Sequence, residues 1–201
     1  MGSKTKQILG DQLDANHKPE MALALTPFTA LCGFLPLPQI AAYLTCIPEF
    51  AALIPTAIVE RFLSISDSLN PTGSAEKGAL KDLFSAVMTA GESLFKEQLS
   101  RLVERYELGG QSIAESSIKD LVLRLNHQFP GDIGVFCAFI LNYVSMSPGE
   151  AIFLAAGEPH AYVSGGMFYC FSSSSVQPQP QNLIRIPNLP LNRYHRMHGH
   201  L

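Results

Sequence analysis

The sequence predicts an α+β protein in which a long helical segment separates two groups of β-strands that form part of a small antiparallel barrel. The strand groups, within residues 20–34 and 131–166, are rich in apolar and aromatic residues and are interrupted by Pro and Gly. Between them, residues 36–130 carry apolar side chains at helical spacing. Residues 167–201 are low in complexity and predict a disordered C-terminal tail.

The composition excludes several classes of protein. Apolar residues make up 47% of the 201 residues and charged residues 15%, so the chain is not disordered as a whole. A net charge of −3 offers no electrostatic basis for binding nucleic acid or an anionic membrane. The four cysteines form no Cys-x-x-Cys pair, which favours free thiols in a reducing compartment over a disulfide framework or a zinc knuckle.

Membrane insertion is the alternative that residues 21–48 raise, because they contain no charged side chain. Pro27, Gly33, Pro36, Pro38 and Pro48 divide this stretch into pieces too short for the roughly 20 helical residues of a membrane span. The leader, residues 1–13, lacks the apolar core of a signal peptide. We therefore expect a cytoplasmic protein, and a monomer.

The elements follow from local patterns along the chain. Residues 20–34 predict one or two short strands broken at Pro27, and residues 38–47 predict a helix that ends at Pro48. Residues 76–107 have a strong helical pattern that Gly91 loosens in the middle. Ser112 and Glu115 form a capping box that predicts the start of another helix, ending before Pro130. The apolar stripes of these helices indicate packing in a helical bundle.

After Pro130 the pattern becomes that of strands. Residues 135–146 and 150–155 predict two strands joined by a type II turn at Pro148-Gly149. A tight loop at residues 156–159 then leads into a strand that begins at His160. Such a succession of short strands and turns is typical of part of an antiparallel barrel.

Two residues stand out as possible metal ligands. Glu20 ends the charged cluster His17-Lys18-Pro19-Glu20, and His160 begins a strand in the stretch GEPHAY. A glutamate and a histidine on different strands can share a zinc ion, although spacing alone also allows solvated or structural side chains. His195, His198 and His200 form a second possible metal-binding group, which we expect to bind only weakly at a terminus.

Three motifs give the chain a resemblance to a known family. Asn-His-Lys-Pro-Glu at residues 16–20, Pro-Gly-Asp-Ile-Gly at 130–134 and Pro-His-Ala-Tyr at 159–162 occur in this order, with a helical stretch between the first two. In this respect residues 14–166 resemble type I phosphomannose isomerase. The resemblance implies a cupin-type barrel (an RmlC-like jelly roll) with a helical insertion domain. It divides the chain into a leader (1–13), a barrel segment (14–35), the helical insertion (36–130), further barrel strands (131–166) and the tail (167–201).

The resemblance also implies a chemistry. The family interconverts mannose 6-phosphate and fructose 6-phosphate, feeds GDP-mannose biosynthesis and binds one zinc ion per chain. Carried over by position, Glu20 and His160 are the implied zinc ligands, and Lys18 and Tyr162 the implied catalytic residues beside the substrate. A zinc ion polarises the sugar carbonyl, and a cation such as Lys18 stabilises the enediolate or the phosphate. We expect His17 to be structural or exposed.

Part of the family pattern is missing from this sequence. The Gln-x-His-Pro motif that supplies two more zinc ligands in the family does not occur before Asp14, and no arginine after Gly166 lies in the context of the family's catalytic arginine. We therefore expect a truncated, inactive product of the isomerase lineage. The alternatives are a non-catalytic protein that acts through its helical bundle, and a membrane-associated protein built on residues 21–48.

Overall fold

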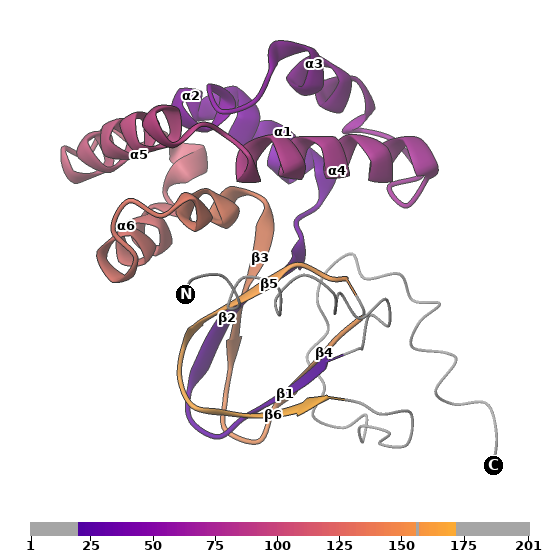
Figure 1. Ribbon diagram of the computed structural model, residues 1–201, viewed down its shortest axis with the longest axis vertical. Helices are drawn as coiled ribbons and strands as arrows, with labels where there is room; N and C mark the ends of the chain where they lie inside the picture. The colour runs from indigo at the N-terminus through magenta and orange to yellow at the C-terminus, as the bar shows by residue number, and fades with distance from the viewer. Residues whose placement is uncertain (1–19, 156, 172–201) are drawn as a thin grey trace, which may run out of the picture.

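The chain folds into a body of helices set on a pair of small β-sheets (Figure 1). The computed structural model describes residues 20–155 and 157–171. Within these ranges the helical body and the sheets each have their own apolar core. This confirms the predicted α+β class.

The helical body follows the first two strands. It consists of α1 (Leu37–Cys46), α2 (Pro48–Ala51), α3 (Thr56–Ile65), α4 (Ser74–Met88), α5 (Glu92–Glu107), η1 (Ile113–Glu115), α6 (Lys119–Gln128) and η2 (Ile133–Phe139). Several ends fall where the sequence predicts them. Pro48 starts α2 directly after α1, and Gly91 lies in the break between α4 and α5.

Six strands form two antiparallel sheets of three. They are β1 (Glu20–Ala24), β2 (Phe28–Phe34), β3 (Leu141–Met146), β4 (Ala151–Leu154), β5 (His160–Ser164) and β6 (Met167–Phe171). One sheet has the order β4-β1-β6 and the other β3-β2-β5. The first strand segment, broken at Pro27 as predicted, therefore supplies the central strand of both sheets.

The two sheets enclose a shared core. Its buried members are mostly small or aliphatic, and alternate residues of each strand contribute to it: Ala22, Ala24, Phe28, Ala30, Cys32, Val144, Met146, Ile152 and Leu154. Leu31 and Val163, on the opposite face of β2 and β5, instead belong to the core of the helical body. The β3-β2-β5 sheet thus packs one face on the shared core and part of the other face on the helical body, and this burial fixes its register.

Three chain segments pass from one sheet to the other at the same corner. Ala24 exchanges backbone hydrogen bonds with the β3–β4 turn, donating to Glu150 O at 2.9 Å and accepting from Gly149 N at 2.8 Å. Leu25 N donates to Gly166 O at 2.9 Å in the β5–β6 corner. Gly165 has φ +98°, and a Cβ placed there would lie 2.4 Å from Pro27 O. Only glycine fits this crossing of backbones.

One arginine links three elements of the helical body. Arg105 of α5 donates two hydrogen bonds of 2.9 Å to Glu49 of α2, and its Nη2 donates to Glu115 Oε1 of η1 at 2.7 Å. Glu115 is 1% exposed and also accepts from the Tyr106 hydroxyl at 3.0 Å. Burial by itself would raise the pKa of Glu115, but the hydrogen bonds from Arg105, Ser112 and Tyr106 hold that pKa at about 2.

The structure corrects three details of the predicted elements. Residues 133–139 form the 3₁₀ helix η2 rather than the first half of a strand, because the Asp132 side chain caps it by accepting from Gly134 N. The capping box at Ser112 is present, but it starts η1, and α6 begins only at Lys119. The predicted tail starts at residue 167, whereas residues 167–171 form β6 against β1.

The Pro148-Gly149 turn joins two strands as predicted, β3 and β4, and these strands pair in different sheets. The stripe Ile118, Leu121, Val122 and Leu125 is buried as predicted. The helix α3 was not separately predicted. No helix in the described part of the chain is both long and apolar enough to cross a bilayer. The predicted disorder of the remaining tail lies outside the described residues.

We expect Gly165→Ala to lower the free energy of unfolding by about 3 kcal/mol, since it adds both an unfavourable φ and a collision with the backbone at Pro27 and Phe28. Gly149→Ala is the matched control, because Gly149 has φ +89° but open space around the added Cβ. It should cost only about 1 kcal/mol. Chemical denaturation of both variants measures the difference, and equal losses would contradict the close packing at this corner.

We expect acid to weaken the helical body through Glu115. Its pKa is lowered from 4.5 to about 2 on folding, so the carboxylate stabilises the native state above about pH 4.5 and this contribution is lost as the pH falls towards 2. The contribution amounts to about 3 kcal/mol. Denaturation at several pH values should show a shallower loss in Glu115→Gln than in the exposed control Glu60→Gln. Parallel pH profiles in the two variants would contradict this role.

Candidate metal site

Glu20 and His160 enter the space between the sheets from opposite sides. Glu20 is the first residue of β1 and shares its face with Ala22 and Ala24, which are buried. His160 is the first residue of β5 and shares its face with Tyr162. The two sheets thus bring together side chains that lie far apart in the sequence.

The two predicted ligands are in direct contact. Glu20 Oε2 lies 2.9 Å from His160 Nε2, and each side chain is 24% exposed. No other hydrogen-bond partner of this buried carboxylate oxygen occurs among the described residues. The site is therefore polar, partly shielded and still reachable from solvent.

The histidine is oriented by the chain just before it. His160 Nδ1 lies 3.0 Å from Glu158 O, and a carbonyl oxygen only accepts hydrogen bonds, so the proton belongs on Nδ1. In the neutral ring, Nε2 then faces the carboxylate with its lone pair. Two acceptors at 2.9 Å repel each other unless a proton or a cation lies between them. This arrangement suits a shared cation.

The donor set fits zinc as two neighbouring ligands. A neutral imidazole nitrogen and a carboxylate oxygen are ordinary zinc donors, and in a tetrahedral site such atoms lie about 3.3 Å apart. The observed 2.9 Å is within a small side-chain movement of that spacing. No third His, Cys, Asp or Glu joins the pair in residues 20–155 and 157–171. The described part of the chain thus brings together two side chains of the kinds that bind zinc.

Tyr162 lies beside the histidine. Its ring is 5.4 Å from the His160 ring and 5.5 Å from the Phe28 ring, measured between centroids. The tyrosine therefore covers one side of the imidazole, and the structure brings this predicted residue to the pair. Lys18, the other predicted catalytic residue, lies outside the described residues, as do His17 and the three tail histidines.

Cys32 is an inward-facing neighbour that the sequence did not single out as part of the site. It is the register partner of His160 and is fully buried. Burial raises the pKa of the Cys32 thiol to about 12, so it stays neutral and is a poor metal ligand. Cys32, Cys46 and Cys137 are free thiols, as predicted.

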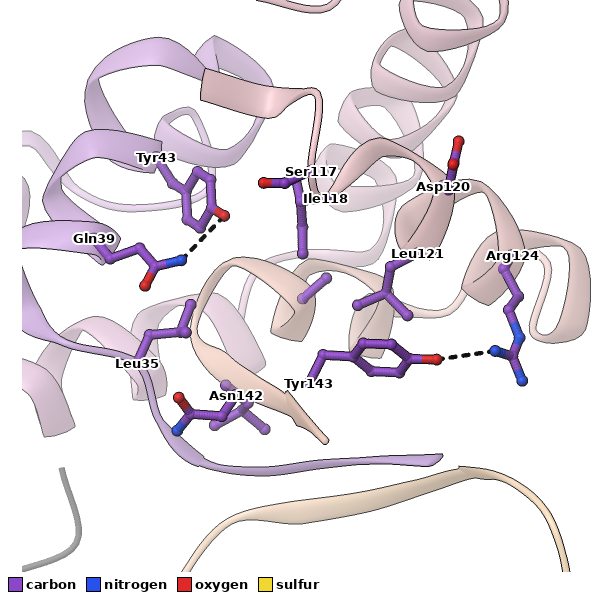
Figure 2. Close-up of a pocket in the computed structure, with 12 residues that line it drawn as sticks. Leu35, Gln39, Tyr43, Ser117, Ile118, Asp120, Leu121, Arg124, Asn142 and Tyr143 are labelled. Atoms are coloured by element: carbon purple, nitrogen blue, oxygen red, sulfur yellow. Dashed lines mark hydrogen bonds between the residues drawn. The ribbon is translucent and has the colours of Figure 1, made fainter. Parts of the chain in front are cut away.

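A separate pocket of about 430 Å³ lies where the helical body meets the sheet (Figure 2). Its polar lining includes Gln39, which donates to the Tyr43 hydroxyl, and Arg124, which donates to the Tyr143 hydroxyl at 3.0 Å. The lining contains neither Glu20 nor His160. The pocket is therefore distinct from the predicted metal site.

Asn142 is the residue near the site that sequence reasoning missed. It is 6% exposed, and its Nδ2 lies within hydrogen-bond distance of three backbone carbonyls of β2. The signal was an asparagine inside the apolar run of residues 133–146, since a buried amide needs partners.

Two family models match most of the described part of the chain, and both describe the same family. The description "Phosphomannose isomerase type I, helical insertion domain" matches residues 59–141, and "Phosphomannose isomerase type I, catalytic domain" matches residues 9–37. Both matches agree with the order of barrel segment and helical insertion predicted from the motifs.

Curated relatives and solved structures give the same result. The chain is 40% identical over 177 residues to the mannose-6-phosphate isomerase of Cryptococcus neoformans and 41% identical over 165 residues to that of Homo sapiens. These alignments cover 80% of this chain but 41% and 38% of the relatives, so the chain spans about two fifths of their length.

Two solved structures share its fold. They are a zinc-bound mannose 6-phosphate isomerase and the apo form from Salmonella typhimurium, each with a TM-score of 0.57 and 27% identity. Each alignment covers 78% of this chain and 35% of the solved chain. The similarity therefore extends over more than three quarters of this chain, but over only about a third of either solved protein.

Proposed function

This chain belongs to the type I phosphomannose isomerase family, and on that premise we propose that Glu20 and His160 are two ligands of a zinc site for mannose-6-phosphate isomerisation. The observation that carries the proposal is the 2.9 Å approach of Glu20 Oε2 to His160 Nε2 across two sheets. The substrates are mannose 6-phosphate and fructose 6-phosphate. A monomeric state and a cytoplasmic location remain predictions from the sequence.

The roles of the residues follow from the reaction. Aldose–ketose isomerisation moves a proton between two adjacent carbons through a cis-enediol. When bound, a zinc ion supplies a Lewis acid for the sugar carbonyl. Glu20 provides the negative charge that holds the cation, and His160 provides a neutral nitrogen with a fixed direction. Tyr162 limits access of water to one side of the imidazole, and Lys18 balances the charge of the phosphate or of the enediolate.

We further propose that this 201-residue chain does not catalyse the isomerisation of mannose 6-phosphate by itself. Catalytic zinc sites use three protein ligands and keep one position open. Two ligands approach each other in the described part of the chain. Two ligands bind zinc more weakly than three do and leave the site one protein ligand short of a catalytic zinc site.

The second candidate is a non-catalytic protein that acts through its helices. Its support is the size of the core of the helical body, which among the described residues has 29 buried members, three of them from strands, against nine between the sheets. The Arg105 cluster joins α2, α5 and η1 without help from the strands. This body can therefore persist whether or not the metal site is complete.

A zinc titration with a coupled isomerase assay tests the first proposal. All proteins carry His195→Ala, His198→Ala and His200→Ala, so that the tail adds no background binding. Loss of a residue that hydrogen-bonds to a zinc ligand weakens zinc binding about 10- to 100-fold. Glu20→Gln and His160→Gln each remove a ligand itself and should weaken zinc binding by more than that. His127→Gln, on α6, is the matched control and should bind as the parent protein does.

The zinc titration and the isomerase assay have three informative outcomes. Equal zinc affinity in the parent and in Glu20→Gln would overturn the metal site. Turnover that Glu20→Gln abolishes would overturn the proposed inactivity, and would mean that this chain or a second copy completes the site. No turnover together with zinc binding that depends on both ligands is the result we expect.

A further inference from the structure

Asn142 is a buried amide with an unusual set of partners. Its Nδ2 lies 3.2 Å from Cys32 O, 3.1 Å from Gly33 O and 2.9 Å from Phe34 O. Two amide protons thus serve three consecutive carbonyl oxygens of β2. A buried carbonyl that loses its donor costs about 1–3 kcal/mol, so the amide stabilises this cluster.

The cluster exists because β2 is bulged at this point. Gly33 has φ +62°, and the pairing of β2 with β3 shifts register between Cys32 and Phe34. At a bulge the regular ladder of backbone hydrogen bonds is interrupted, and the local carbonyls need another donor. Asn142, on the neighbouring strand β3, supplies it.

The bulge in turn holds the loop that precedes His160. Gly33 N donates to Pro159 O at 2.9 Å. One residue earlier, Glu158 N donates to Ala155 O at 3.0 Å and closes a turn in which Gly157 has φ +78°. Glu158 O is the acceptor for His160 Nδ1. Three hydrogen bonds, joined by the backbone of Gly33 and of residues 158–159, therefore connect the Asn142 amide to the imidazole.

We propose that Asn142 is a positioning residue for His160: through the Gly33 bulge and the loop at residues 158–159, it fixes the ring so that Nε2 faces Glu20. It does not touch the metal or the substrate. The inference rests on the proposed function for its metal, zinc, but the orientation of the ring is a property of the protein without metal. Outer partners of this kind set both the tautomer and the direction of a metal-binding histidine.

The test replaces the donor amide by an isosteric acceptor. In Asn142→Asp a carboxylate faces three carbonyl oxygens, which repel it, so the bulge must rearrange. Asn70→Asp makes the same change at an exposed site between α3 and α4 and is the matched control. Two readouts are used on the full chain: the ¹⁵N shifts of the His160 ring, which report which nitrogen carries the proton, and the affinity for zinc alone, measured in the background without the tail histidines.

We expect Asn142→Asp to change the His160 ring shifts and to weaken zinc binding about 10- to 100-fold, while Asn70→Asp changes neither. Unchanged ring shifts in Asn142→Asp would overturn the inference. If Asn142→Asp does not fold, Asn142→Ser replaces it, because its short hydroxyl cannot reach all three carbonyls, and the same two outcomes apply.

The two readouts also separate this inference from the proposed function. Ring shifts that change in a protein whose parent binds no zinc through Glu20 would uphold the positioning role and overturn the metal site. Zinc binding that depends on Glu20 but not on Asn142 would uphold the metal site and overturn the positioning role.

Discussion

The corner at which β1 passes into β2 is the constraint on which the rest of the barrel strands depend. Backbone hydrogen bonds from Ala24 and Leu25 hold the β3–β4 turn and the β5–β6 corner against it, and Gly165 lets the backbones cross closely. The three segments β1–β2, β3–β4 and β5–β6 all bend at this corner, so each contributes one strand to each sheet. The β1–β2 segment lies in the middle of both sheets. The inward faces of the two sheets therefore share one apolar core.

This arrangement places Glu20 and His160 at the ends of β1 and β5 that lie away from the corner. Glu20 begins the strand that runs into the corner, and His160 begins the strand that leads to it from the other sheet. Neither residue is brought to the other by local sequence. Their contact is a consequence of the shared corner, of small inward residues such as Ala22 that let the sheets approach, and of the Asn142 amide at the β2 bulge.

Much of this could be predicted from the sequence, for identifiable reasons. Pro27, Pro48 and the Pro148-Gly149 turn act locally, so their breaks appear where expected. The helical stripes around Leu83 and Leu121 follow from periodicity. Glu20, His160 and Tyr162 were found through motif resemblance, and spacing alone did not distinguish them from solvated residues.

The failures share a physical cause. The buried run at residues 133–139 is apolar in every direction, so periodicity cannot separate a strand from the 3₁₀ helix that the Asp132 cap starts. Strand β6 was assigned to a tail because its pairing with β1 is non-local. Asn142 was overlooked because its three acceptors lie more than 100 positions away in the sequence. Tertiary partners, and not local preference, decided each case.

The most direct test of the central claim is the position of a zinc ion in a crystal of this chain, located by anomalous scattering at the zinc edge. The account predicts one anomalous peak about 2.0–2.2 Å from Glu20 Oε2 and from His160 Nε2, with Nδ1 still directed at Glu158 O. Zinc bound only at the tail histidines, or at no ordered position while Glu20 and His160 keep their contact, would contradict it.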